Sequence, residues 1–149
     1  MDALLLLARD QEVVLEKEDF AVRDVVDSEV ERIRPLLEGK SVQLDVDIQA
    51  EPELHAPPRV LGVIVRNLLG NAVRFTDTGH IRISLLADRI EVEDTGIGMD
   101  AATLARAFEP FYRIDATATG AGLGLSIAQR LGDRCGWPLR LTSTPGHGT

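Results

Sequence analysis

The stretch Asp94-Thr95-Gly96-Ile97-Gly98 decides how the rest of this sequence is interpreted. It follows the alternating run Ile90-Glu91-Val92-Glu93, which predicts a β-strand that ends at a carboxylate. The two glycines then allow the backbone to approach a ligand closely, because neither carries a Cβ. The same pattern is also typical of an ordinary turn after a strand. Its meaning therefore depends on the segments around it.

The segments just before this strand predict a hairpin and a long helix. An alternating apolar run at 81–85 and a turn at 87–89 make the first half of the hairpin. The helix is expected from about Arg59 to Phe75, because its apolar residues recur three or four positions apart. Asn67, Asn71 and Arg74 interrupt this pattern on one helix face.

Those three polar residues allow two interpretations. The two asparagines could simply face solvent, although Asn is a poor residue for a helix interior. Alternatively, their amide oxygens could bind a hard cation, with Arg74 beside the anion that accompanies it.

The N-terminal part predicts further helices and strands. Residues 1–10 are expected to be helical and 12–15 to form a short strand. Asp19 is expected to cap a helix that runs to about Glu38. An alternating run at 42–48 predicts a strand with one buried face.

The C-terminal part begins with a short predicted helix, about Asp100 to Ala107. An aromatic run follows at 108–113, and 114–119 has no periodicity and is expected to be a mobile loop. Gly122 and Gly124 precede a helix predicted from Ser126 to about Leu131. Their backbone N–H groups would lie at the positive end of the helix dipole and suit a phosphate, although a plain glycine loop is the alternative. A last strand is expected at 139–141.

Composition limits the class of protein. The 149 residues suffice for one domain with a core, and the net charge of −8 argues against binding to nucleic acid or anionic membranes. The single cysteine, Cys135, forms no internal disulfide and fits a reducing compartment. No apolar run approaches the roughly 20 residues of a spanning helix.

Taken together, these motifs resemble the ATP-binding catalytic domain of bacterial sensor histidine kinases, within the wider gyrase, Hsp90, histidine kinase and MutL superfamily. Five boxes in the family's order carry the resemblance. They are the N box at 67–75, the first glycine box at 94–99, the F box at 108–113, the second glycine box at 120–128 and the third at 145–149.

The resemblance implies a fold and a domain organisation. The fold would be a two-layer α/β (α+β) sandwich of the Bergerat type, in which a mixed β-sheet packs under three α-helices and a flexible ATP lid spans about Met99 to Ala121. Residues 1–10 would be the tail of a dimerisation and phosphoacceptor helix, and residues 11–149 the ATP-binding catalytic domain.

The resemblance also implies roles for individual residues. Asn71 would coordinate Mg²⁺ with help from Asn67, and Arg74 would face the phosphates; these three are the expected catalytic residues. Asp94 would accept a hydrogen bond from the adenine amine, and Phe75 would lie against the base. The remaining expected nucleotide-binding residues are Gly96, Ile97, Gly98, Phe111, Arg113, Gly122, Leu123, Gly124, Leu125 and Thr149.

Two departures shape the expected reaction. Hydrolysing relatives commonly have a glutamate four positions before the metal-binding asparagine, whereas this chain has Asn67, which cannot act as a general base. None of the three histidines, His55, His80 and His147, lies on an early amphipathic helix as the family's acceptor does. We therefore expect transfer of the γ-phosphate from MgATP to a histidine on a separate dimerisation domain, for relay to the receiver domain of a response regulator.

Three other functions stay open at this point. They are an ATPase that drives conformational change, a non-catalytic nucleotide-binding module, and a serine kinase of the anti-sigma type. The expected location is the cytoplasm, within a parent protein anchored in the inner membrane, and the fragment itself is expected to be monomeric.

Overall fold

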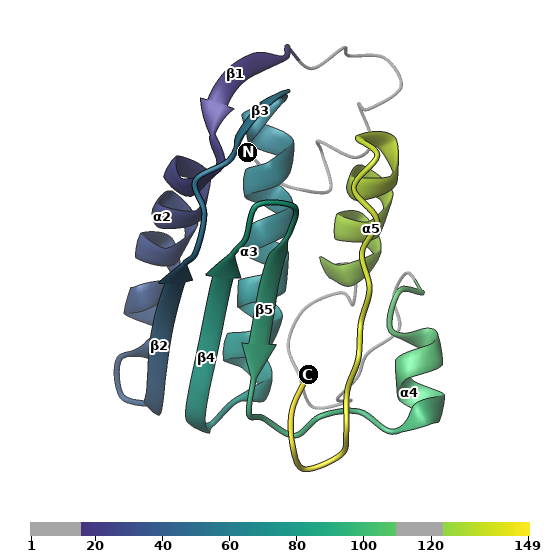
Figure 1. The fold of residues 1–149 in the computed structure, drawn as a ribbon. Coiled ribbons are helices and arrows are strands. Elements are labelled where there is room, and N and C mark those ends of the chain that lie inside the picture. The colour runs from purple at the N-terminus through teal and green to yellow at the C-terminus, as the bar shows by residue number, and fades with distance from the viewer. Residues whose placement is uncertain (1–15, 110–123) are drawn as a thin grey trace.

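The computed structural model describes residues 16–109 and 124–149, arranged as a sheet with helices on one face (Figure 1). The main sheet has the order β2-β4-β5. β2 (Ser41–Ile48) runs parallel to β4 (Thr78–Leu85), which pairs antiparallel with β5 (Ile90–Asp94). A second, two-stranded sheet joins β1 (Glu18–Ala21) to β3 (Glu53–Ala56). The predicted hairpin and the strand at 42–48 are therefore confirmed.

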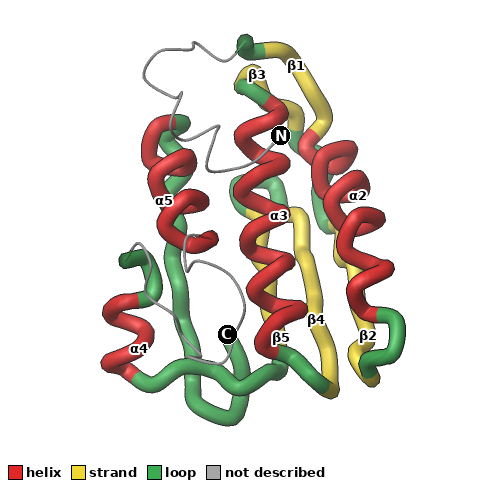
Figure 2. The backbone as a smooth tube through the Cα atoms, turned by 180° about the vertical axis from the view of Figure 1, so that it is seen from behind, coloured by secondary structure: helices red, strands yellow, loops and turns green. Residues whose placement is uncertain are grey.

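The helices form the second layer. α2 (Val22–Ile33), α3 (Pro58–Phe75) and α5 (Gly124–Arg134) lie side by side on one face of the sheet, with α3 in the middle, and α4 (Ala101–Arg106) lies below α5 (Figure 2). The mixed sheet and the single helical layer confirm the predicted two-layer sandwich. None of the described helices is long and apolar enough to span a membrane.

The prediction for the first long helix is wrong at both of its ends. Asp19 lies in β1, paired with His55, and does not cap the helix, whose N-cap is Ala21. Ala21 makes no side-chain cap hydrogen bond and is instead held by its pairing with Glu53 in the two-stranded sheet. At the other end α2 stops at Ile33, and Pro35 belongs to a 3₁₀ turn, η1 (Arg34–Leu37), because proline lacks the N–H that an α-helix needs there.

The predicted last strand is also wrong. Residues 138–143 form no strand, and the only bridge in the described C-terminal segment joins Thr144 to Gly148. Leu139 and Leu141 instead pack against two different hydrophobic clusters. Leu139 packs against the cluster between α3 and α5, whereas Leu141 packs against Met99 and its neighbours. The helix predicted at 1–10 and the strand at 12–15 lie outside the described residues.

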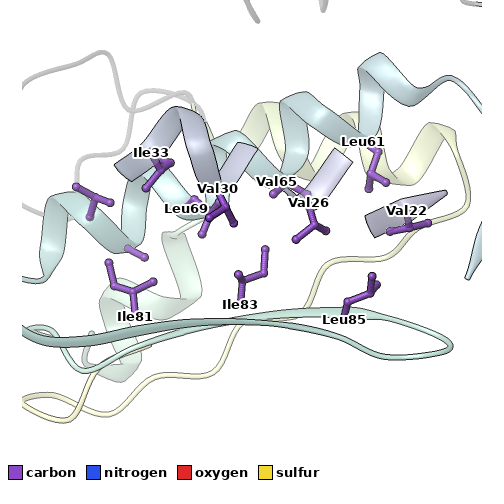
Figure 3. Close-up of a cluster of buried hydrophobic side chains, with 12 residues drawn as sticks. Val22, Val26, Val30, Ile33, Leu61, Val65, Leu69, Ile81, Ile83 and Leu85 are labelled. Atoms are coloured by element: carbon purple, nitrogen blue, oxygen red, sulfur yellow. The ribbon is translucent and has the colours of Figure 1, made fainter. Parts of the chain in front are cut away.

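The core lies between the sheet and the first two helices (Figure 3). β4 contributes Ile81, Ile83 and Leu85, which are all at most 1% exposed, because every second residue of a strand faces the same side. α2 and α3 contribute apolar residues at helical spacing. This packing fixes α3, and with it the polar face that carries the candidate site.

A buried carboxylate on α2 forms an ion pair with α3. Glu29 is only 4% exposed, and both of its carboxylate oxygens accept hydrogen bonds from Arg66, at 3.0 Å each. Hydrogen bonding to Glu29 raises the pKa of Arg66. The bidentate geometry satisfies a carboxylate that would otherwise be costly to bury.

The core predicts how a matched pair of leucine substitutions affects stability. Leu69→Ala should lower the free energy of unfolding by about 3 kcal/mol, because it leaves a cavity where the side chain is fully buried. Leu36→Ala should change it by less than about 0.5 kcal/mol, because that side chain is 58% exposed. Urea unfolding followed by circular dichroism measures both values. Equal losses in the two variants would contradict the assigned core.

Candidate functional site

The polar face of α3 places two amide oxygens beside the start of α5. A Cβ built on Gly124 would lie 3.2 Å from Asn67 Oδ1 and 3.8 Å from Asn71 Oδ1. The Nδ2 group of Asn67 donates to Val63 O at 2.9 Å, which leaves Oδ1 directed toward Gly124. The predicted N box and second glycine box are therefore brought together.

The last turn of α3 carries the other two N-box residues. Arg74 is exposed, and no ion pair engages it within residues 16–109 and 124–149. Phe75 is half-buried, and its carbonyl oxygen accepts a hydrogen bond from Ile97 N at 3.1 Å. The α3 terminus thus meets the first glycine box through its backbone.

Asp94 at the end of β5 is oriented through one of its carboxylate oxygens. Oδ1 accepts from Gly96 N at 2.9 Å and from Thr149 N at 3.2 Å. The backbone N–H of Asp94 donates to Thr149 O at 2.8 Å, so the third glycine box closes on the first. No hydrogen bond engages Oδ2 in the described part of the chain, which leaves an oriented acceptor for a ligand.

Glycine is required where these loops touch. A Cβ on Gly96 would collide with Phe75 O, and a Cβ on Gly148 would collide with Asp94 O. Gly98 has a φ of +67°, and a Cβ there would collide with Thr144 O. The first and third glycine boxes are consequently packed backbone against backbone. The side chain of Ile97 stays 51% exposed beside this contact.

Ser143 holds these loops together, although the sequence analysis did not select it. Its Oγ accepts from Met99 N at 2.7 Å and donates to Gly148 O at 2.8 Å. Since its single proton is used there, the hydroxyl of Thr149, at 2.8 Å, donates to Ser143. The only sequence signal is a small polar residue just before the third glycine box.

The start of α5 supplies backbone donors opposite the two asparagines. The first four N–H groups of a helix have no partner within it, and they lie at the positive end of its dipole. Gly124 begins α5, while the side chain of Leu125 is buried against Met99 and Ala107. Four other predicted nucleotide-binding residues, Phe111, Arg113, Gly122 and Leu123, lie outside the described residues.

A buried hydroxyl lies beside the first glycine box. Thr76 Oγ1 is the only buried side-chain polar atom among the described residues that lacks a hydrogen-bond partner. It lies next to Gly96, 2.9 Å from a Cβ built on that residue. Buried groups of this kind are uncommon and often indicate a site that a water or ligand completes.

These donors and acceptors fit a nucleotide with a divalent cation. Asp94 offers an acceptor for an exocyclic amine, and the N–H groups of α5 suit phosphate oxygens. The amide oxygens of Asn67 and Asn71 are the groups beside Gly124 that would hold such a cation, together with the phosphates. Magnesium is commonly bound in this way, through few protein ligands and substrate oxygens.

Comparisons with known proteins identify relatives of this chain. The family described as "Histidine kinase-, DNA gyrase B-, and HSP90-like ATPase" matches residues 57–149. Sensor protein TorS of Escherichia coli (strain K12) is 34% identical over 155 residues, which cover 100% of this chain and 17% of TorS. Sensor histidine kinase RcsC of the same strain is 32% identical, over 93% of this chain and 16% of RcsC. The chain thus spans a small part of the length of these curated relatives.

Solved structures share the fold. Full-length ShkA, in complex with AMPPNP, has a TM-score of 0.82 and 27% identity over 98% of this chain and 32% of that one. The cytoplasmic segment of histidine kinase QseC has a TM-score of 0.71 and 23% identity, over 97% of this chain and 83% of that one. The latter likeness concerns the fold alone.

Two glycine substitutions test the contact between α3 and the first glycine box. Gly96→Ala should destabilise the protein by about 2 kcal/mol and disrupt the loop after β5, because the added methyl group collides with Phe75 O. Gly70→Ala is the control: it lies in α3 with nothing within 4 Å of its Cβ, so it should stabilise by about 0.5–1 kcal/mol. Thermal unfolding measures both. A neutral Gly96→Ala variant would show that the contact does not exist.

Proposed function

The chain belongs to the histidine kinase-, DNA gyrase B- and HSP90-like ATPase family as an ATP-binding domain, and we propose that it transfers the γ-phosphate of MgATP to a histidine on a separate phosphoacceptor domain. One observation carries the proposal: Asn67 and Asn71 direct their amide oxygens toward Gly124 at the start of α5. This arrangement suits a phosphate-bound cation between two helices.

The base would be recognised at the C-terminal end of α3, one turn beyond Asn71. Asp94 Oδ2 accepts a hydrogen bond from the exocyclic amine of adenine, while Oδ1 stays bound to the N–H groups of Gly96 and Thr149. Phe75 lies at the same end of α3 and would pack against the base. A guanine presents a carbonyl oxygen at the equivalent position, so a carboxylate there would reject it.

The triphosphate would extend from this end toward α5. Its oxygens accept from the N–H groups at the start of α5, and Arg74 supplies a positive charge that no described carboxylate neutralises. Magnesium, held by Asn71 with help from Asn67, would neutralise charge on the phosphate oxygens during transfer. Positioning and charge neutralisation supply most of the catalysis in such a reaction.

Asn67 favours transfer to histidine over hydrolysis. A water nucleophile must lose a proton, and an amide cannot accept it. A neutral imidazole attacks phosphorus with a nitrogen lone pair, so the attacking atom needs no base. The new N–P bond forms as the bond to the bridging oxygen breaks, and ADP leaves with the electron pair. Since the relatives are sensor kinases, a receiver domain is the proposed next acceptor.

Two substitutions at the site should abolish ATP binding without unfolding the domain. In Asp94→Asn the amide oxygen keeps the bonds to Gly96 and Thr149, so its NH₂ group faces the adenine amine. We expect the affinity for ATP to fall by about 100-fold or more, since a buried donor is left unpaired.

The second substitution, Asn71→Asp, should remove Mg²⁺-dependent binding by placing a negative charge beside the phosphates. Calorimetry with and without Mg²⁺ measures both, and Asp88→Asn in the exposed turn after β4 is the control. Unchanged affinity in both variants would refute the site.

Transfer is tested with γ-labelled ATP and a separate histidine-bearing dimerisation domain. The proposal predicts label on the acceptor, in an acid-labile form, and none when that histidine is replaced. Release of labelled phosphate at the same rate with and without the acceptor would instead support an ATPase.

A further inference from the structure

α3 ends without a residue in the left-handed region. The residue after the helix, Thr76, is extended, with φ −118° and ψ 109°. Helices commonly end instead at a glycine in the left-handed region, which satisfies their last carbonyl groups locally. The last carbonyl groups of α3 are therefore open to partners from outside the helix.

Lys40 supplies one of these partners from a distant part of the sequence. Its Nζ donates to Val73 O at 2.8 Å and to Thr76 O at 3.3 Å. The ammonium group also lies 3.8 Å from the exposed carboxylate of Asp77. Its positive charge thus meets the negative end of the α3 dipole.

The backbone of Lys40 is fixed as well. Gly39 has a φ of +84°, which turns the chain after η1, and Lys40 N then donates to Leu37 O at 3.0 Å. β2 begins at the next residue. The side chain is only 30% exposed, so it is held between the start of the sheet and the end of the helix.

The last turn of α3 has a second partner, Ile97, which belongs to the first glycine box of the nucleotide site. Phe75 O accepts from Ile97 N, and Gly96 packs directly against that carbonyl group. Lys40 binds the carbonyl oxygens on either side of this contact. Movement of the last turn of α3 would therefore displace Phe75 and the loop that orients Asp94.

We propose that Lys40 is a positioning residue for adenine recognition: it holds the C-terminal end of α3 so that Phe75 and the first glycine box keep the geometry that a base requires. This inference rests on the proposed function. Lys40 does not contact the nucleotide. Its loss should affect the adenine end of the site most and leave the start of α5, about Gly124, largely unchanged.

Lys40→Met tests the proposal, because it keeps the aliphatic chain and removes the donor. The chain contains one other lysine, exposed Lys17, so Lys17→Met is a matched control. Lys40→Met should weaken binding of ATP and of ADP by a similar factor of about tenfold. It should also reduce discrimination between ATP and GTP. Lys17→Met should bind all three nucleotides like the wild type.

Two further variants separate positioning from general destabilisation. Val26→Ala shortens a fully buried side chain of α2 and should lower the melting temperature with the ATP-to-GTP affinity ratio unchanged. Lys40→Arg keeps a charged donor, so its ATP-to-GTP affinity ratio should be close to that of the wild type. This variant is measured in place of Lys40→Met if the methionine variant does not fold.

The outcomes distinguish this inference from the proposed function. If the wild type binds no ATP, the proposed function fails. If the wild type binds ATP and a folded Lys40→Met variant keeps the affinity and the ATP-to-GTP ratio of the wild type, only the role of Lys40 is refuted. The role of Lys40 would also be refuted if the ATP-to-GTP affinity ratio fell by the same factor in Lys40→Met and in Val26→Ala.

Discussion

The contact between the last turn of α3 and the loop after β5 is the constraint on which the rest of the site depends. It is made by backbone atoms, Ile97 N on Phe75 O, and it requires a glycine at position 96. Because backbone groups are close-packed there, the contact fixes the distance from the N box to Asp94. The core between β4 and α3 keeps both partners in place.

The site divides into two ends with different physical requirements. The Asp94 end is built from glycines and a carboxylate whose Oδ1 accepts from two backbone N–H groups, which suits recognition of one edge of a base. The Asn71 end offers neutral oxygens and a helix terminus, which suit charge carried by the ligand itself. α3 spans both ends, so a single helix relates the base to the reacting phosphate.

Local sequence patterns predicted the parts of this structure that depend on periodicity. α3 and the β4–β5 hairpin were predicted because their apolar residues follow one period over many positions. β3 was not predicted, and Asp19 was assigned to a cap, because a four-residue strand exists only through its partner. The roles of Ser143 and Lys40 depend on contacts between residues far apart in the sequence, which periodicity does not encode.

The most direct test of the account is a crystal structure of the domain with Mg²⁺ and a non-hydrolysable ATP analogue. We expect the adenine amine within hydrogen-bonding distance of Asp94 Oδ2, and the metal bound by Asn71 Oδ1 and phosphate oxygens. A nucleotide bound elsewhere on the domain, or a base that makes no contact with Asp94, would contradict it.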